Sequence, residues 1–260
     1  MTIQFSARDM VVLTILAEMY GAPLDLVASM LGVSRSRAYR IVARWQKAHM
    51  ISANRVRPVP GAMWVYPTRS ACEALLDRSV RYWVPTPKMA AHTRAVLELR
   101  LKLTGLDLDR WIPERLLHAE IGVTPAGQSR PHVHDGRYFT SEGDLRAVEV
   151  ELTAKNAAAA RSAVVQALAV AKQAGCARLT YYCRGEAVKN VIRAASADLG
   201  GPGEPQMRLL DLDDTLAPQQ AESSSPASRP GLRVIAGGAA DHEISQDSNT
   251  NDDDGKAVGS

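Results

Sequence analysis

Three carboxylates and a lysine in the segment HVHDGRYFTSEGDLRAVEVELTAK have the types and spacing for metal-dependent chemistry. Asp135 begins one predicted strand, around residues 132–139, and Glu149 and Glu151 lie in the next, around residues 145–152. Because residues i and i+2 of a strand share a face, Glu149 and Glu151 point the same way, between apolar neighbours. If Asp135 lies across a hairpin from them, the three form an oxygen cluster suited to Mg²⁺ or Mn²⁺.

The lysine of this segment extends the same chemistry. Lys155 follows Glu151 closely, where its ammonium group could neutralise a phosphate or orient a water molecule. The sequence therefore predicts a catalytic set of Asp135, Glu149, Glu151 and Lys155, with Asp135 and Glu149 as ligands of Mg²⁺ or Mn²⁺. The alternative is a domain without catalysis, in which Glu149 or Glu151 forms a salt bridge with an arginine and the fold serves binding or dimerisation.

Two histidines in the same segment offer a different metal site. The sequence His132-Val133-His134 resembles the metal-binding motif of HUH nickases, which attack DNA with a tyrosine. The nearby residues that would complete such a site are His118, Tyr138, Tyr181 and Tyr182. Two histidines at this spacing also arise by chance, and ordinary polar roles are the alternative.

Basic residues crowd the N-terminal turns of a helix predicted to begin at Ser34. The apolar residues Ile41, Val42 and Trp45 face the core, so the opposite face carries long hydrogen-bond donors for bases and phosphates. A basic turn rich in Pro and Gly follows at residues 54–61. The predicted DNA contacts are Arg35, Ser36, Arg37, Tyr39, Arg40 and Arg44 on the helix, and Arg55 and Arg57 in the turn. A solvated surface helix is the alternative interpretation.

The elements around these arginines follow the order of a winged helix-turn-helix domain. The first helix is predicted to begin after Ser6, with Asp9 as the acid of a capping pair, and to end at Gly21. Its apolar face is formed by Met10, Leu13, Ile15, Leu16 and Met19. Further helices are predicted at about residues 24–31, 34–48 and 68–78, and two short strands at 50–51 and 63–66.

The acidic segment belongs to a second set of elements, in which helices and strands alternate. Helices are predicted at about residues 89–103, from Pro113 to 119, at 156–174 and at 186–199. Strands are predicted at 178–184 and 207–212, in addition to the two that carry the acids. The predicted fold class is therefore α/β (α+β overall), with a small mixed-sheet domain after the N-terminal one.

Charge is distributed unevenly along the 260 residues, although the net charge is only +3. Residues 1–100 hold 14 Lys and Arg against 6 Asp and Glu, whereas residues 211–260 hold 3 against 10. The basic N-terminal part indicates a polyanion as partner. The polar, acidic tail cannot bury enough apolar surface to offset its ordering entropy, so it is predicted to be disordered.

Composition and the absence of certain motifs exclude several classes of protein. Apolar residues make up 46% and charged residues 23%, as in ordinary soluble proteins. The 3 cysteines have no CxxC spacing, which favours reduced thiols over a disulfide framework or structural zinc. The sequence contains no apolar run that could cross a membrane and no GxxxxGK[ST] loop, and the lack of a basic segment before the first apolar stretch leads us to expect no signal peptide. We therefore expect a cytoplasmic protein without membrane contact.

The order of Asp, hairpin, Glu-x-Glu-x-x-x-Lys and Ala-rich helix resembles a variant of the PD-(D/E)XK nuclease superfamily. The resemblance implies that Asp135 and the next acid hold a catalytic divalent metal, that Lys155 serves phosphodiester hydrolysis, and that Glu114 is a further acid. The sequence departs from the pattern in two places. His134 stands where Pro usually precedes the Asp, and Glu151 stands where the Lys is expected. A nuclease fold that has lost its activity would show the same departures.

A longer resemblance covers about Phe5 to Asp211. The predicted winged helix, followed by AHTRAVLELRLKL, WIPERLL, HDG and VEVELTAK, is similar to the replication-relaxation family of plasmids and integrative elements. It implies a DNA-binding protein in replication, relaxation or transfer of a mobile element. The implied partners are double-stranded DNA and either a second copy of the chain or replication and transfer proteins. The alternative is a winged-helix transcriptional regulator without enzymatic activity.

These patterns divide the chain into four parts, with Pro85 and Pro87 marking a linker. Residues 1–84 are the predicted winged helix-turn-helix DNA-binding domain, and 85–104 are the linker and connecting helix. Residues 105–215 form the predicted PD-(D/E)XK-like α/β domain, and 216–260 the disordered tail.

Overall fold

The protein combines helices with two β-sheets, which confirms the α+β class. The computed structural model describes residues 4–122, 127 and 130–218. All elements named below belong to one compact unit, residues 1–218. The predicted disordered tail lies outside the described residues from position 219 onward.

The first half of this unit is built around three short helices, α1 (Ala7–Glu18), α2 (Leu24–Leu31) and α3 (Arg35–Lys47). A capping box begins α1, because the Ser6 and Asp9 side chains each accept a backbone N–H of the other residue. The side chain of Ser34 caps α3. The apolar faces of the three helices meet in one core, in which Leu13, Leu16 and Trp45 are fully buried.

Two segments that are distant in sequence form the small sheet, β1 (Ala22–Pro23) and β2 (Trp64–Val65), which are antiparallel. The chain reaches β1 through Gly21, whose φ of +83° lies in the left-handed region. A side chain at Gly21 would also collide with the Val65 carbonyl, because a Cβ there would lie 2.5 Å from its oxygen. The close approach of β2 therefore requires glycine at this position.

Helix α4 (Arg69–Leu76) packs on α1, and α5 (Pro87–Thr104) connects the two halves of the unit. The ion pair of Arg100 on α5 with Glu18 on α1 has an N–O distance of 2.6 Å, and the Arg100 side chain is fully buried. Buried ion pairs of this kind fix the relative placement of the elements that they join, because either charge left alone would be strongly unfavourable.

The second half contains a five-stranded sheet in the order β3-β4-β5-β6-β7. Strands β3 (Trp111–Pro113), β4 (Gly136–Phe139) and β5 (Leu145–Glu151) are antiparallel neighbours. Strands β6 (Arg178–Cys183) and β7 (Gln206–Asp211) continue the sheet parallel to β5. At Gly136 the Trp111 ring lies against the backbone, where a Cβ would be 2.3 Å from a ring carbon.

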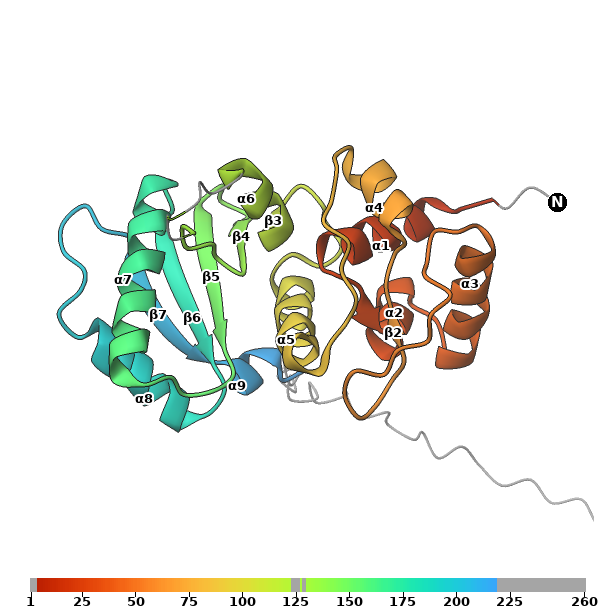
Figure 1. The fold of residues 1–260 in the computed structure, drawn as a ribbon. Coiled ribbons are helices and arrows are strands. Elements are labelled where there is room, and N and C mark those ends of the chain that lie inside the picture. The colour runs from red at the N-terminus through yellow and green to blue at the C-terminus, as the bar shows by residue number, and fades with distance from the viewer. Residues whose placement is uncertain (1–3, 123–126, 128–129, 219–260) are drawn as a thin grey trace, which may run out of the picture. The chain divides into compact units, whose positions relative to one another are not determined.

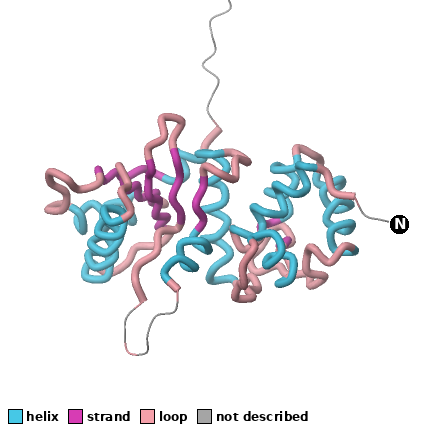
Figure 2. Tube along the Cα trace, turned by 90° about the horizontal axis from the view of Figure 1, so that it is seen from above, coloured by secondary structure: helices cyan, strands magenta, loops and turns pink. Residues whose placement is uncertain are grey.

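Helices cover both faces of this sheet (Figures 1 and 2). On one face, α7 (Ala157–Gln173) and α8 (Glu186–Ser196) bury Ala147, Leu179 and Tyr181. On the other face, Val148, Val150 and Tyr182 pack in the core shared with α5. Helix α6 (Glu114–Ile121) follows β3, and α9 (Leu212–Leu216) follows β7. Strand β5 is therefore buried on both faces.

Local features differ from the sequence-based expectation. The predicted strand at 50–51 is reduced to an isolated bridge between Ile51 and Pro67, and β2 pairs with β1 instead. Strands β1 and β3 were not predicted, because both end in a proline that is typical of a helix start. Met10, expected on the buried face of α1, is 39% exposed.

Asp9 is expected to be critical for the N-terminal helices. Its carboxylate is 3% exposed and accepts hydrogen bonds from Arg44 Nη2 (2.6 Å), Trp45 Nε1 (3.2 Å) and Ser6 N (2.8 Å). Asp9→Ala should lower the free energy of unfolding by about 3 kcal/mol, because it leaves buried donors unpaired. Arg44→Ala should cost about 1 kcal/mol, because Ser6 and Trp45 still bind Asp9. Urea denaturation measures both free energies of unfolding. Equal losses in the two variants would contradict the role of Asp9 as the shared acceptor of these hydrogen bonds.

Candidate functional site

Two buried carboxylates stand on the central strand of the large sheet. Glu149 is 6% exposed and Glu151 is 7% exposed, and both lie on β5 between apolar residues. Burial of ionised carboxylates is strongly unfavourable unless they are paired or bind a cation. Burial raises the pKa of Glu149 well above its ordinary value, and the charges of Asp135 and Glu151 raise it further.

Asp135 is brought to these glutamates by the hairpin of β4 and β5. It lies one residue before β4, and its Oδ2 accepts the backbone N–H of Val150 at 2.7 Å. Just before β4 begins, the Asp135 carboxylate therefore accepts the β5 N–H that a backbone carbonyl would accept within a sheet. This geometry places Asp135 beside β5, as the hairpin hypothesis required.

His92 on α5 is the second partner of Asp135. Its Nε2 lies 2.8 Å from Asp135 Oδ1. Burial alone would lower the His92 pKa, but the hydrogen bond to Asp135 and the Asp135 charge outweigh it and raise the pKa to about 8. His92 is therefore mainly a cation at neutral pH. No local pattern in the sequence indicated this contact, because His92 lies in an ordinary amphipathic helix far from Asp135 along the chain.

Lys155 and His132 contact the two glutamates. Lys155 forms an ion pair with Glu151 from the loop that leads into α7. His132 Nε2 lies 2.8 Å from Glu149 Oε1. Burial lowers the pKa of His132, so the imidazole is mainly neutral at neutral pH. The structure thus brings together all four predicted catalytic residues, Asp135, Glu149, Glu151 and Lys155, and adds two histidines to them.

The histidine-pair alternative is disfavoured by the contacts of His134. Ring nitrogens of His132 and His134 and a Glu149 oxygen lie within 4.8 Å of one another. However, His134 Nε2 is 3.0 Å from the Ala167 carbonyl, and its Nδ1 accepts from Arg137 Nε at 3.2 Å. Both ring nitrogens are occupied, which leaves no lone pair for a metal.

The tyrosines of that alternative are divided between two faces of the sheet. Tyr138 and Tyr182 belong to the core on the α5 side, whereas Tyr181 lies on the α7 side with the glutamates. Tyr181 is opposite Glu149 on β6, and its buried hydroxyl has no hydrogen-bond partner among the described residues. Only Tyr181 is thus on the face that carries the acids.

The donor set fits a hard divalent cation. Asp135 and Glu149 supply carboxylate oxygens, the ligands that Mg²⁺ and Mn²⁺ prefer. The raised pKa of Glu149 and the unpaired hydroxyl of Tyr181 both indicate a polar centre that is not fully satisfied by protein groups. A cation at these oxygens would relieve the repulsion among the three acids.

Glu114 extends the acidic centre toward α6. It is the first residue of α6, and its Oε1 lies 3.1 Å from His118 Nε2. Burial raises the Glu114 pKa, and the Asp135 charge raises it further. The negative charge of Asp135 therefore acts on Glu114, although Glu114 begins α6 and Asp135 precedes β4. His118, the predicted third ligand of the histidine alternative, is bound to Glu114 instead.

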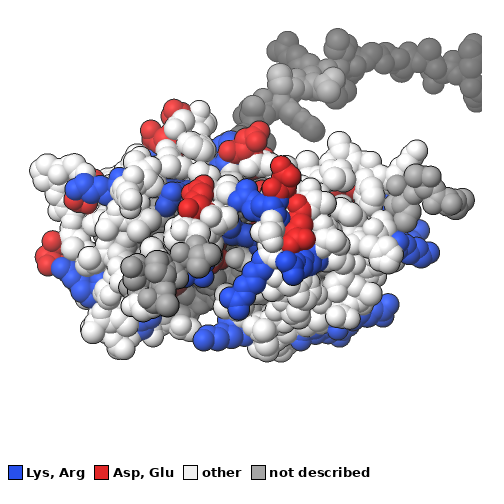
Figure 3. Space-filling view, turned by 45° about the horizontal axis from the view of Figure 1, so that its top comes forward, with Lys and Arg blue, Asp and Glu red and all other residues white. Residues whose placement is uncertain are grey.

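The exposed face of α3 carries the predicted DNA contacts. Arg35, Ser36, Arg37, Tyr39 and Arg40 are all exposed, as are Arg55 and Arg57 in the loop before β2. In Figure 3, Lys and Arg side chains follow the margin near the N-terminal helices, whereas most visible acidic side chains lie toward the centre and the other end.

A groove of about 400 Å³ joins α3 to this loop, and Tyr39, Arg55 and Arg57 are among its lining residues. The structure thus brings helix and loop contacts to one surface. Arg44 differs from the others, because its ion pair with Asp9 at 2.6 Å ties it to α1. Its main contact is therefore structural.

Comparison with known proteins identifies no relative: no family model, curated protein or solved structure matches this chain. No described helix is long and apolar enough to cross a membrane.

His134 should make stability depend on pH. It is fully buried, and burial lowers its pKa to about 4 from an ordinary 6.5. Between these values the unfolded chain binds a proton that the folded chain does not, so the free energy of unfolding falls as the pH falls. This loss should be on the order of 3 kcal/mol between pH 7 and pH 4.

The test is urea denaturation of the wild type and His134→Gln across this pH range. The wild type should lose more stability on acidification than the variant, which lacks the titrating group. Parallel pH profiles would show that His134 is not held neutral by its surroundings.

Proposed function

We propose that this is a DNA-binding protein that cleaves a DNA strand with the help of a divalent cation. In this proposal, residues 1–84 are a winged helix-turn-helix domain and residues 105–215 are a PD-(D/E)XK-like domain. The resemblance to the replication-relaxation family suggests that the cleavage serves replication, relaxation or transfer of a mobile element.

The observation that carries this proposal is the acidic centre at the β4–β5 hairpin. Two buried glutamates on β5 face the same side, and Asp135 is held beside that strand by the Val150 N–H. A protein that needed only a stable sheet would place apolar residues here, because buried like charges reduce stability. A centre that binds Mg²⁺ or Mn²⁺ explains why carboxylates occupy these positions.

Each group has a definable part in hydrolysis. Asp135 and Glu149 would hold the cation, which, when bound, polarises a phosphate oxygen and activates water. His92 orients Asp135 through its 2.8 Å contact. The Lys155 side chain is 41% exposed and is restrained by Glu151, so it can stabilise phosphate charge beside the carboxylates.

Cleavage of supercoiled plasmid with Mn²⁺ tests this function. The wild type should convert supercoiled to nicked plasmid only with the metal. Glu149→Gln should reduce the rate by at least about 10²-fold, because a ligand charge is removed while the shape is kept. Glu186→Gln is a matched control, because Glu186 is an exposed residue at the start of α8, on a different element.

The proposal fails if the wild type shows no metal-dependent nicking of plasmid while it still binds the same plasmid. It also fails if Glu149→Gln and Glu186→Gln cleave at the same rate, because the activity would then come from a contaminant or another site. Thermal unfolding of each variant verifies that the chain is folded.

DNA binding is expected to depend on the exposed face of α3. Arg37→Ala combined with Arg40→Ala should weaken binding, and the salt slope, log Kd against log salt, should fall by about 0.9 for each phosphate that is no longer neutralised. Arg178→Ala combined with Arg193→Ala removes the same charge from the far elements β6 and α8. Fluorescence anisotropy over a salt series measures both slopes. Equal effects of the two double variants would contradict a specific role of α3.

A second function is supported by one observation. Asp135 and Glu151 already have protein partners, in His92, Val150 and Lys155, so the centre is partly satisfied without a metal. A winged-helix transcriptional regulator with an inactive nuclease-like domain would have such contacts. In that case Asp135→Asn should leave DNA affinity unchanged, and the plasmid should remain uncut under all metal conditions.

A further inference from the structure

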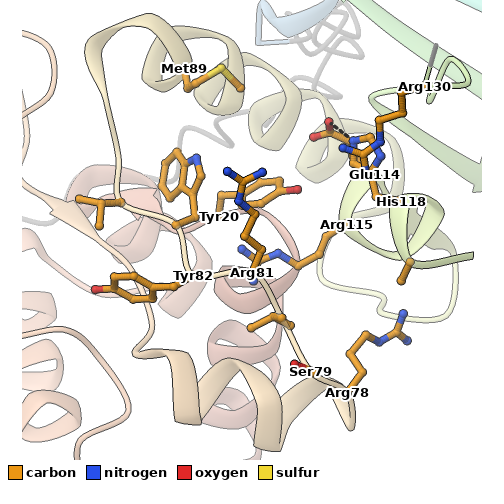
Figure 4. A pocket seen from close by; sticks show the side chains of 14 residues that line it. Tyr20, Arg78, Ser79, Arg81, Tyr82, Met89, Glu114, Arg115, His118 and Arg130 are labelled. Carbon is orange, nitrogen blue, oxygen red and sulfur yellow. Dashed lines mark hydrogen bonds and ion pairs between the residues drawn. The ribbon is translucent and has the colours of Figure 1, made fainter. Parts of the chain in front are cut away.

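A pocket of about 450 Å³ lies between the segment 78–84, the start of α5 and helix α6. Figure 4 shows its side chains, and the dashed contact in that view joins Glu114 to His118. The volume is in the range of small-molecule sites, 300–1,000 Å³ as a rough guide. Neither the acidic centre nor the α3 surface uses these residues, apart from Glu114 and His118 at the edge.

Four arginines give this pocket a strong positive charge. Arg78, Arg81, Arg115 and Arg130 line it, and none of them forms an ion pair within the part of the chain that the structure describes. Arg115 is held in place by the Ala17 carbonyl, at 2.8 Å from its Nη1. Glu114 is the acid among the lining residues, and His118 already binds it. The arginines therefore offer guanidinium groups to an anion.

Aromatic and apolar side chains line the same space. Tyr82, Val84 and Met89 are 45%, 41% and 39% exposed, and they are among the most exposed large apolar residues of the described chain. The ring centroids of Tyr20 and Trp83, which also line the pocket, lie 5.4 Å apart. Exposed apolar groups at the border of a pocket often mark a binding surface.

Tyr20 is held in an unusual backbone conformation at this pocket. Its φ of +60° is in the left-handed region, which non-glycine residues seldom adopt. The Arg115 guanidinium lies 4.2 Å from the centre of the Tyr20 ring. Tyr20 directly follows Met19, the C-cap of α1, so this conformation ends the helix and places Tyr20 at the pocket.

The geometry points to a nucleotide-binding pocket that holds the phosphorylated terminal nucleotide of a DNA strand, with Arg81 and its neighbours at the phosphate and the Trp83 ring against the base. Guanidinium groups form bidentate hydrogen bonds with phosphate, and aromatic rings stack on any base. An acidic peptide would use the charge but would not require the rings.

The placement of Glu114 favours a strand over a free nucleotide. Glu114 borders the pocket and directly follows Pro113, which pairs with Gly136, the residue after Asp135, so the pocket adjoins the acidic centre. A strand whose end occupies the pocket would then run toward the carboxylates. This choice of source rests on the proposed function, whereas the nucleotide chemistry of the pocket does not.

Fluorescence anisotropy with short single strands tests the pocket in the full-length protein, with EDTA present to prevent cleavage. The probes are strands of about four nucleotides, with and without a 5′-phosphate. The phosphorylated strand should bind about tenfold more tightly. Arg81→Ala should abolish that preference, and Trp83→Ala should weaken binding of both probes about tenfold because the ring no longer stacks on the base. Arg193→Ala, an exposed arginine on α8, should change neither.

Competition with deoxyadenosine monophosphate distinguishes the two sources. Displacement only at concentrations far above those of the strand supports a strand end, whereas equal potency overturns the strand and leaves a free nucleotide as ligand. Equal affinity of the two probes, or equal effects of Arg81→Ala and Arg193→Ala, overturns the pocket altogether. Metal-dependent plasmid nicking by Arg81→Ala would then show that the proposed cleavage stands without the pocket.

Discussion

Two buried carboxylates in the middle strand of the large sheet are the constraint that the surrounding elements have to satisfy. Strand β5 is covered by helices on both faces, yet Glu149 and Glu151 occupy positions where apolar side chains would stabilise the fold more. Burial and the neighbouring acids raise the pKa of Glu149 well above its ordinary value. The sheet retains this unfavourable arrangement because other elements supply partial compensation at each carboxylate.

These compensating groups come from elements far apart in the sequence. His92 reaches Asp135 from α5, His132 reaches Glu149 from the segment before β4, and Lys155 reaches Glu151 from the loop before α7. Helix α5 must therefore be held firmly, and the buried pair of Arg100 and Glu18 does this by joining it to α1. The N-terminal helices thus support the acidic centre as well as presenting a basic surface of their own.

The sequence predicted the longer elements and much of the candidate site, because these follow from local patterns. Alternation revealed β5 and its paired glutamates, and a capping residue with an apolar period revealed α3. The pairing of the two-residue strands β1 and β2 could not be predicted from local patterns, because it depends on a tertiary contact at Gly21. The contact of His92 with Asp135 and the ion pair of Arg44 with Asp9 were not predicted for the same reason, because in each pair the two residues are far apart in sequence.

The most direct measurement of the central claim is calorimetric titration of the protein with Mn²⁺ in the absence of DNA. We predict one saturable site per chain in the wild type, with binding that strengthens as the pH rises because the metal competes with protons for the carboxylates. Asp135→Asn should weaken this binding at least about tenfold, since it removes one ligand charge. Equal Mn²⁺ affinity of the wild type and Asp135→Asn would contradict the assignment of the acidic centre as a metal site.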